Sequence, residues 1–583
     1  MIAVPLWRGW ILCGLLACSK HDAPAPPPST VPVSAPATVT VDDRYSDAAL
    51  GSLTFKLTEG TPAARAHFMR GLLALHSFWY DEALRQFAAA ISADPTMNMA
   101  YWGAAMSQCQ LLWGEDNLEV ARRLLKQMPT PDKLSEREQA WIVAALQLVG
   151  EGDVRTTRRN FAQAMEELNK EFPDDESATF LAIALLSATP AGAPDEMAVR
   201  KRAAGLAATV FERNPRHPGA AHYIIHAYDT PELAPLGLPY ARQYAQIAPA
   251  AFHARHMPAH IFSRLGMWKE AITSCKAAWD ASLAATAREK LTPDHDDFHS
   301  LNWLIEMNFE LGHRKEADVA FERFRAAVTG GLTHSTRVLY AAQVASYLIR
   351  TGEWTRVDEL LAPLDTPATA PAAMPAMPAM PAMPVPSSAT AHCASAADTP
   401  STALQEQLFV LVARARAAAA KHDVAKTTAL ADQIDAVGTE LRHFLQATQS
   451  AEAMHNLDAS NANRRAALLA RAKGDDGALV AALRGTVTTA PGGESNPNGF
   501  LPEEEIGEAL LRMNQPKQAA ASFASALAKQ PKRARSLLGL ARAQTKLGNR
   551  EGARASYREL GELWTTADDG TPGLDEVHAS SSQ

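Results

Sequence analysis

The chain has 583 residues, of which 47% are hydrophobic, and it carries a formal net charge of −8. A chain of this length can bury a large core from its own side chains, and its acidic balance argues against nucleic acid as a partner. Its five cysteines are scattered and do not form the disulfide framework of a small secreted domain.

The first 18 residues, MIAVPLWRGWILCGLLAC, join a basic residue, Arg8, to an apolar run that is too short to span a bilayer. The end of this run, Leu15 to Cys18, resembles the lipobox of bacterial lipoproteins. That resemblance implies cleavage before Cys18 and lipidation of its thiol, and Ser19 as the next residue favours the outer membrane. We therefore expect a lipid-anchored protein on the periplasmic side of a bacterial membrane. The alternative is an ordinary signal peptide and a secreted or periplasmic protein.

Composition divides the rest of the chain into two helical blocks and three polar or proline-rich segments. The expected segments are a Pro/Ala-rich disordered tether over 19–45, an N-terminal helical block over 46–365, a Pro/Met/Ala linker over 366–402, a C-terminal helical block over 403–564 and a disordered tail over 565–583. Within the linker, methionines in MPAMPAMPAMPVP recur every three residues. Such thioethers can hold Cu(I), and slippage of a simple repeat explains the pattern equally well.

A repeated pattern of small and aromatic residues indicates the fold. Two stretches place a small residue, an aromatic residue, a second small residue and a proline at the same spacing: Ala83-Phe87-Ala90-Pro95 and Ala519-Phe523-Ala526-Pro531. Ala553 and Tyr557 follow Ala519 and Phe523 by 34 residues. This is the length of a tetratricopeptide repeat, in which small residues let two helices approach and the aromatic residue fills the space between them. We predict an all-α solenoid of antiparallel helix pairs, with two such units in the C-terminal block and essentially no sheet.

Five longer segments resemble a known family. They are HSFWYDEA (76–83), AYWGAAM (100–106), HYIIHAYD (222–229), HMPAHIF (256–262) and FHSLNW (298–303). With them the chain resembles bacterial exported tetratricopeptide-repeat proteins, whose activity is not established. The resemblance implies a fold and a candidate surface but no reaction. Asn302 stands where the family carries an aspartate, so position 302 is a weak candidate for an anionic ligand.

Two histidine pairs recur at the repeat length. His222 and His226 are spaced i,i+4, as are His256 and His260, and the second pair follows the first by 34 residues. Since i,i+4 residues share a helical face, the four imidazoles should converge on the concave side of adjacent helices. We predict a metal site at these four residues, with His299 and Asp229 as further candidate ligands, for a transition metal such as Zn, Cu, Fe or Ni.

Two alternatives to the metal site remain open. The histidines can line a polar groove for an anionic or peptide ligand, or they can form structural hydrogen bonds. The weak point of the prediction is Pro258, because a helix that begins there would separate His256 from His260. We name Asp229 and Glu306 as candidate partners for the second ring nitrogens.

Other polar and aromatic residues are candidates for the groove. The predicted groove or ligand-binding residues are His76, Trp79, Tyr80, Trp102, Asn302 and Glu306. Helix packing is the alternative for His76, Trp79, Tyr80 and Trp102. The acidic loop at 294–297 can donate ligands or cap the next helix.

No enzyme signature is present in the sequence: a P-loop, a GxSxG elbow, an HExxH motif and paired metal-binding cysteines are all missing. We therefore expect a cell-envelope scaffold that binds a protein or peptide segment in its concave groove, contacts the membrane only through its lipid and does not bind nucleic acid. The alternative is a metal-dependent hydrolase or oxidoreductase that uses the same histidines.

Overall fold

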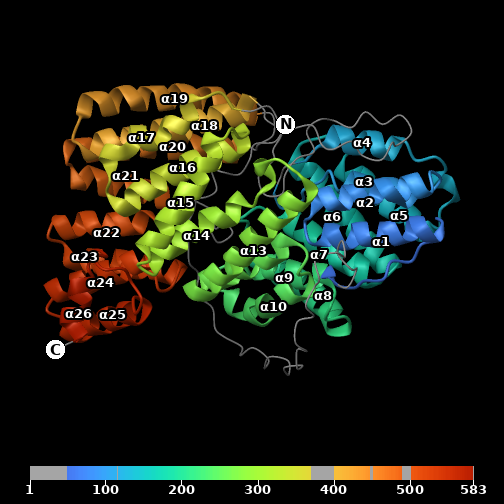
Figure 1. The fold of residues 1–583 in the computed structure, drawn as a ribbon, viewed down its shortest axis with the longest axis horizontal. Helices are drawn as coiled ribbons and strands as arrows, with labels where there is room; N and C mark the ends of the chain where they lie inside the picture. The colour runs from blue at the N-terminus through green and yellow to red at the C-terminus, as the bar shows by residue number, and fades with distance from the viewer. Residues whose placement is uncertain (1–48, 114–115, 369–399, 447–450, 489–500, 582–583) are drawn as a thin grey trace.

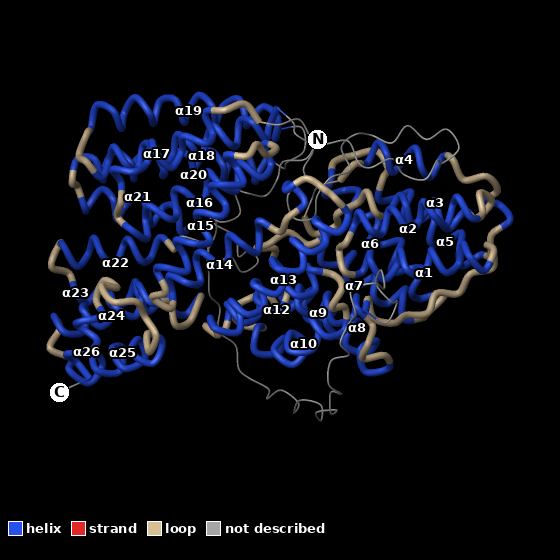
Figure 2. Tube along the Cα trace, in the orientation of Figure 1, coloured by secondary structure: helices blue, strands red, loops and turns tan. Residues whose placement is uncertain are grey.

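A computed structural model describes residues 49–113, 116–368, 400–446, 451–488 and 501–581. Every regular element in these ranges is a helix, and Figure 2 shows no strand among them. The expected all-α fold is confirmed. Residues 1–48, with the expected leader, Cys18 and the whole of the expected tether, lie outside the described residues, as does most of the Pro/Met linker.

The N-terminal block comprises seventeen of the described α-helices. The first nine are α1 Pro62–His76, α2 Tyr80–Ala93, α3 Asn98–Met106, α4 Leu118–Lys126, α5 Glu136–Leu148, α6 Val154–Glu171, α7 Asp175–Ala188, α8 Glu196–Arg213 and α9 Pro218–Tyr228. The others are α10 Ala234–Ile247, α11 Phe252–His256, α12 Pro258–Arg264, α13 Trp268–Glu289, α14 Phe298–Glu310, α15 Arg314–Thr329, α16 His334–Thr351 and α17 Val357–Leu361.

The C-terminal block begins at Pro400, close to the expected boundary. Its helices are α18 Pro400–Ala420, α19 Val424–Gln446, α20 Ala451–Lys473, α21 Asp476–Thr488, α22 Pro502–Arg512, α23 Pro516–Lys529, α24 Ala534–Lys546, α25 Arg550–Leu563 and α26 Leu574–Ser581. Each helix packs on the next along the chain, and α16 packs on α18. The stack therefore continues from one block into the other, and Figure 1 shows α14 to α16 between the two ends.

The same packing device holds the repeats at both ends of the chain. The ring of Phe87 on α2 fits between Gly71 on α1 and Gly103 on α3, where an added Cβ would lie 2.9 Å and 2.3 Å from the ring. Near the C-terminus the ring of Phe523 fits in the same way between Gly507 and Gly539. The glycines are required because no larger residue leaves room for the aromatic ring between the helices.

The last helices return to the middle of the chain. The indole Nε1 of Trp268 donates to the carbonyl of Lys532 at 2.8 Å, and the backbone N–H of Asp568 donates to the carbonyl of Gly312 at 2.9 Å. The prediction of a disordered tail over 565–583 is therefore wrong as far as residue 581. Leu574 and Val577 of α26 are buried, and that burial orders the segment. Among the described residues, no helix combines the length and the apolar character needed to cross a bilayer.

Candidate metal centre

Helix α9 presents the first histidine pair to the protein interior. Pro218 occupies its first turn, and the Nδ1 of His217 caps it by accepting from the backbone N–H of Ala220 at 3.1 Å. The side chains of His222 and His226 project from one face of this helix, and these residues are 0% and 2% exposed. The helix thus buries two imidazoles one turn apart.

Pro258 does not separate the second pair. Helix α11 ends at His256 and α12 begins at Pro258, but Met257 between them keeps helical angles of φ −52° and ψ −35°. The Nε2 atoms of His256 and His260 lie 3.1 Å apart. The proline therefore removes one backbone hydrogen bond without turning the two imidazoles apart.

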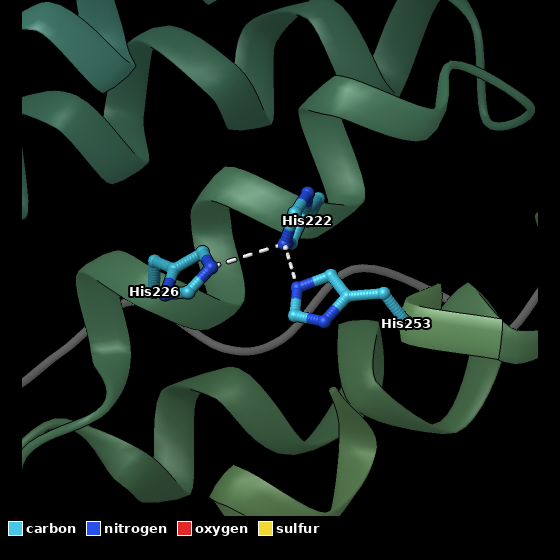
Figure 3. Close-up of side chains that lie close together, drawn as sticks. All are labelled: His222, His226 and His253. Atoms are coloured by element: carbon cyan, nitrogen blue, oxygen red, sulfur yellow. Dashed lines mark hydrogen bonds between the residues drawn. The ribbon is translucent and has the colours of Figure 1, made fainter. Parts of the chain in front are cut away.

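Three imidazoles form what we call the first triad: His222, His226 and His253. The Nε2 atom of His222 lies 3.0 Å from Nε2 of His226 and 3.2 Å from Nε2 of His253 (Figure 3). Helix α9 supplies two of the rings, and α11 supplies the third. All three residues are buried.

A second triad consists of His256, His260 and His299, which come from α11, α12 and α14. The rings of His256 and His299 are 4.7 Å apart between centroids. His299 is the only partly exposed member, since His256 and His260 are buried. The two triads together are called the histidine row below.

Hydrogen bonds behind the second triad fix the ring protons of His260 and His256. The Nδ1–H of His260 donates to the Asp229 carboxylate at 3.0 Å. Ser300 donates its hydroxyl hydrogen to Asp297, so its oxygen is left to accept from the Nδ1–H of His256 at 2.9 Å. Both Nε2 atoms then carry lone pairs, and they face each other. Only a cation between them relieves this contact, either a proton on one ring or a metal ion.

The Cys275 thiol is a weaker partner of the same nitrogen, with its sulfur 3.5 Å from Nδ1 of His256. Burial raises the pKa of this thiol well above its usual value. Cys275 therefore stays a neutral thiol behind the second triad.

In the first triad, too, more ring nitrogens approach one another than hydrogen bonds can satisfy. The Nδ1–H of His222 donates to the carbonyl of His76 at 2.7 Å, which leaves a single lone pair on Nε2. Two further Nε2 atoms approach that one lone pair. The Nδ1 of His253 is buried and has no hydrogen-bond partner among the described residues. Hydrogen bonding alone therefore leaves this triad incompletely satisfied.

The spacing of the nitrogens suits a metal ion. Two imidazole nitrogens bound to one tetrahedral ion at 2.0–2.1 Å each lie about 3.3 Å apart. The three Nε2 pairs of the row are separated by 3.0, 3.2 and 3.1 Å. The outer hydrogen bonds to a carbonyl, a carboxylate and a hydroxyl are those that orient histidine ligands in metal sites.

Burial keeps several of these imidazoles neutral. It lowers the pKa of His222, His253 and His256 well below the usual histidine value, and the neighbouring histidines lower it further. Burial opposes the ionisation of Asp229, but Arg264 and His260 outweigh it and hold the pKa of that carboxyl well below its usual range. Neutral imidazoles with an ionised carboxylate behind them are the protonation states that metal binding requires.

Aromatic rings enclose the row. Phe78, in the turn between α1 and α2, lies 4.3 Å from His222 and 5.6 Å from His253 between ring centroids. Its φ of +53° is a left-handed conformation that costs a bulky residue free energy. On the other side, Trp303 lies 4.9 Å and 4.7 Å from the rings of His256 and His260. The environment therefore excludes water from most of the row.

A third group of possible metal ligands consists of His76, Glu176 and His217. Their ring nitrogens and carboxylate oxygens all have hydrogen-bond partners within the protein. The Nε2–H groups of both histidines donate to the two oxygens of Glu176 at 2.7 and 2.9 Å. The Nδ1 of His76 lies 3.1 Å from the hydroxyl of Tyr223, and that of His217 caps α9. Burial opposes the ionisation of Glu176, but the histidines outweigh it and lower its pKa to about 2. This group is structural, because every polar atom already has a partner.

The structure places all the predicted metal candidates in or beside the row, but it divides the four predicted histidines between the two triads, and Asp229 lies behind His260 rather than among the facing nitrogens. It also places Asp297 as the N-cap of α14, where its carboxylate accepts from the backbone N–H of Ser300 at 3.0 Å. That outcome favours the capping alternative for this part of the acidic loop. Whether the row binds a metal stays a prediction.

Several predicted groove residues lie elsewhere. Trp102 is in the aromatic core against Phe68 and Trp141, not on a groove. Trp79 and Tyr80 are also buried, and His76 belongs to the structural group around Glu176. The predicted role of Glu306 beside the histidines is wrong, because its carboxylate pairs with Arg350 at 3.0 Å. Asn302 is buried, and its Oδ1 has no hydrogen-bond partner among the described residues.

Sequence reasoning missed His253 and Phe78. His253 precedes His256 by three residues in the same short helix, and this spacing was the available signal. Phe78 carried no such signal, because its contact with the row depends on how the turn after α1 folds back.

The repeats of the C-terminal block have a counterpart among known sequence families. The profile of the tetratricopeptide repeat matches residues 510–562, which include α23, α24 and all but the last residue of α25. The C-terminal block carries tetratricopeptide repeats. In these repeats the glycines on either side of Phe523 occupy the same places as those around Phe87 in the first helices. No curated protein matches the chain.

Several solved structures align along most of the chain. The Naa15/Naa10 complex bound to HypK-THB aligns over 89% of this chain and 74% of its own at 12% identity, with a TM-score of 0.23. The human IFIT1 dimer with m7Gppp-AAAA aligns over 87% and 96% at 12% identity, with a TM-score of 0.31. Yeast Tom70 aligns over 89% and 96% at 12% identity, with a TM-score of 0.29.

Proposed function

We propose that this protein is a binding scaffold of the bacterial cell envelope that holds a transition metal at its histidine row. The observation that supports the metal site is that several imidazole Nε2 atoms point toward one another inside the row. The outer partners of His222, His256 and His260 take up their Nδ1–H groups, so three Nε2 lone pairs point into the row. Buried lone pairs that face one another are stabilised when they share a cation.

The scaffold part of the proposal rests on the repeats. Stacked helix pairs of the tetratricopeptide type build an extended concave surface, and we propose that a protein or peptide segment binds there. The location rests on the leader sequence that ends at Cys18. We expect a Cys18→Ala variant to appear in the soluble or uncleaved fraction of the host cell. Membrane fractionation identical to that of the wild type would refute the lipid anchor.

A metal-dependent hydrolase is the second candidate. Each triad offers three imidazoles, and three protein ligands on zinc leave a fourth position for water or a substrate. Hydrolysis of ester or peptide probes by the zinc-loaded protein, abolished by a chelator and restored by zinc, would favour this candidate over a purely structural metal.

Elemental analysis tests the metal site directly. The protein is purified with its leader processed, stripped with a chelator, reloaded with Zn²⁺ and desalted before analysis. We expect bound zinc in the wild type and a loss of it when His222 and His256 are both changed to alanine. The control is His443→Ala on α19, which removes an exposed imidazole and should retain all the zinc. A wild type without bound metal, tested also with Cu⁺ and Ni²⁺, would overturn the proposal.

A further inference from the structure

The histidine row is divided into two groups by distance. Within each triad, one ligand atom from every imidazole lies within 4.8 Å of the others. The Nε2 contacts of 3.0, 3.2 and 3.1 Å all fall inside a triad, two of them at His222 and one between His256 and His260. Nitrogens bound to one tetrahedral ion at 2.0–2.1 Å lie about 3.3 Å apart, so these contacts mark two separate candidate positions for an ion.

The boundary between the two triads falls within one helix, α11. His253 and His256 both belong to α11, yet the Nε2 of His253 meets His222 while the Nε2 of His256 meets His260. A spacing of i,i+3 places two side chains close together but displaced around the helix, so each can serve a different neighbour. His253 thereby completes the first triad, which has only two members in the repeated sequence pattern.

Each triad also has its own support. In the first, the carbonyl of His76 orients His222. In the second, Asp229 orients His260, and the hydroxyl of Ser300 orients His256. No outer partner among these is shared, so the loss of one triad leaves the hydrogen bonds behind the other intact.

We propose that the histidine row is a pair of three-imidazole sites that bind two separate transition metal ions. The inference rests on the proposed function, since it assumes that the row binds metal. His222, His226 and His253 hold one ion, and His256, His260 and His299 hold the other. Three imidazole nitrogens suit ions of intermediate softness such as Zn²⁺, Co²⁺ and Cu²⁺, and each ion keeps one position for a further ligand.

Titration with Co²⁺ tests the number of sites, because cobalt bound to three or four ligands has strong visible absorption. We expect two Co²⁺ per chain in the wild type and one in each of two variants, His253→Gln and His299→Gln. The double variant should bind none, and His443→Ala should bind two. Circular dichroism shows whether each variant keeps its helices.

The outcomes separate this inference from the proposed function. One Co²⁺ per wild-type chain, or the loss of both ions in His253→Gln with its helices intact, would overturn the pair of sites while leaving the metal-binding function in place. No bound Co²⁺, Zn²⁺ or Cu²⁺ in the wild type would overturn both. A stoichiometry that falls in His443→Ala would show that cobalt binds elsewhere and would also count against the pair.

Electron paramagnetic resonance of the Cu²⁺-loaded wild type needs no variant. Two Cu²⁺ ions held in adjacent triads lie close enough to couple magnetically, so we expect a half-field transition and dipolar broadening at two equivalents. An uncoupled spectrum with two bound Cu²⁺ would place the second ion outside the row and overturn the inference.

Discussion

The carboxylate of Glu310 accepts a hydrogen bond from the backbone N–H of Ala534 at 2.7 Å, across 224 residues of sequence. Glu310 ends α14, the helix that carries His299 near its start. Ala534 begins α24 in the tetratricopeptide repeats. The C-terminal repeats thus hold the far end of a helix that contributes to the second triad.

Glu310→Ala should destabilise the protein strongly. The Glu310 side chain is buried and also pairs with Arg350 at 2.8 Å, so its loss leaves a buried guanidinium with fewer partners. Removing one member of a buried ion pair costs about 3–5 kcal/mol. The free energy of unfolding from urea denaturation measures this. The control Glu359→Ala breaks an exposed pair with Arg356 and should change stability by less than about 1 kcal/mol. Equal effects of the two substitutions would contradict the prediction.

Acid should weaken the contact between α14 and the C-terminal repeats by protonating Glu504. Burial opposes ionisation of this carboxyl, but Arg533 outweighs it and lowers the pKa from 4.5 to about 2. Because the folded-state pKa is the lower one, the stabilisation is complete above pH 4.5 and disappears as the pH falls toward 2. This lowering of the Glu504 pKa corresponds to about 3 kcal/mol of folding stability above pH 4.5.

Melting temperatures of the wild type and Glu504→Gln between pH 7 and pH 2.5 test this sign. The variant should be less stable at neutral pH, and the difference should narrow only below about pH 4.5. Glu559→Gln, at an exposed position on α25, should follow the wild type throughout. A constant difference between Glu504→Gln and the wild type would show that folding does not lower the pKa of Glu504.

The fold could be predicted from the sequence because its signal is local and repeated. The small and aromatic residues around Phe87 recur around Phe523, and each set specifies the packing of adjacent helices. The two histidine pairs followed from the same periodicity. What the sequence could not show was how segments between the repeats fold back, which is why the contact of Phe78 with the row was missed and the ordering of α26 was not expected.

Of the two carboxylates predicted as partners of the second ring nitrogens, Asp229 makes that contact and Glu306 does not, and the direction of the side chain decides the difference. Glu306 occupies the predicted place on α14, but its carboxylate turns to Arg350 and Gln343. Asp229 stands at the end of α9, and its carboxylate reaches His260 on the next pair of helices. A buried carboxylate pairs with the cation or imidazole that lies nearest in three dimensions, and periodicity alone does not contain that information.

Glu176→Gln separates the structural histidine group from the metal row. The two oxygens of Glu176 accept from His76 and His217, whereas a glutamine amide offers one oxygen and turns an N–H group toward one of the rings. We expect a loss of about 1–3 kcal/mol of stability. The amount of zinc bound by the folded variant should not change, and elemental analysis checks this. A loss of zinc would place His76 or His217 among the ligands.

Substitution of Phe78 should reverse the usual order of stability, so that the glycine variant is more stable than the alanine variant. Either substitution removes a buried aromatic ring and should cost about 3–5 kcal/mol. At a φ of +53° alanine retains the left-handed strain and glycine does not. We therefore expect Phe78→Gly to be about 0.5–1 kcal/mol more stable than Phe78→Ala in urea denaturation. The usual order, with alanine the more stable, would show that the turn relaxes once the ring is gone.

Two glycine-to-alanine substitutions should have opposite effects on stability. At Gly103 an added Cβ would lie 2.3 Å from the ring of Phe87, which is fully buried and has no room to move. Overpacking of this kind costs about 1–3 kcal/mol. At Gly205, within the exposed face of α8, no atom lies within 4 Å of the added Cβ. Alanine there should stabilise the helix by about 0.5–1 kcal/mol, since glycine loses more backbone entropy on folding.

Thermal and urea denaturation of both variants measure the difference. Gly539→Ala serves as a second test in the tetratricopeptide repeats, where the added Cβ would lie 2.3 Å from the ring of Phe523. Because both rings fit between glycines in the same manner, Gly103→Ala and Gly539→Ala should lose similar stability. A neutral effect at both sites would mean that the helices shift apart readily, and the aromatic ring would then not determine their spacing.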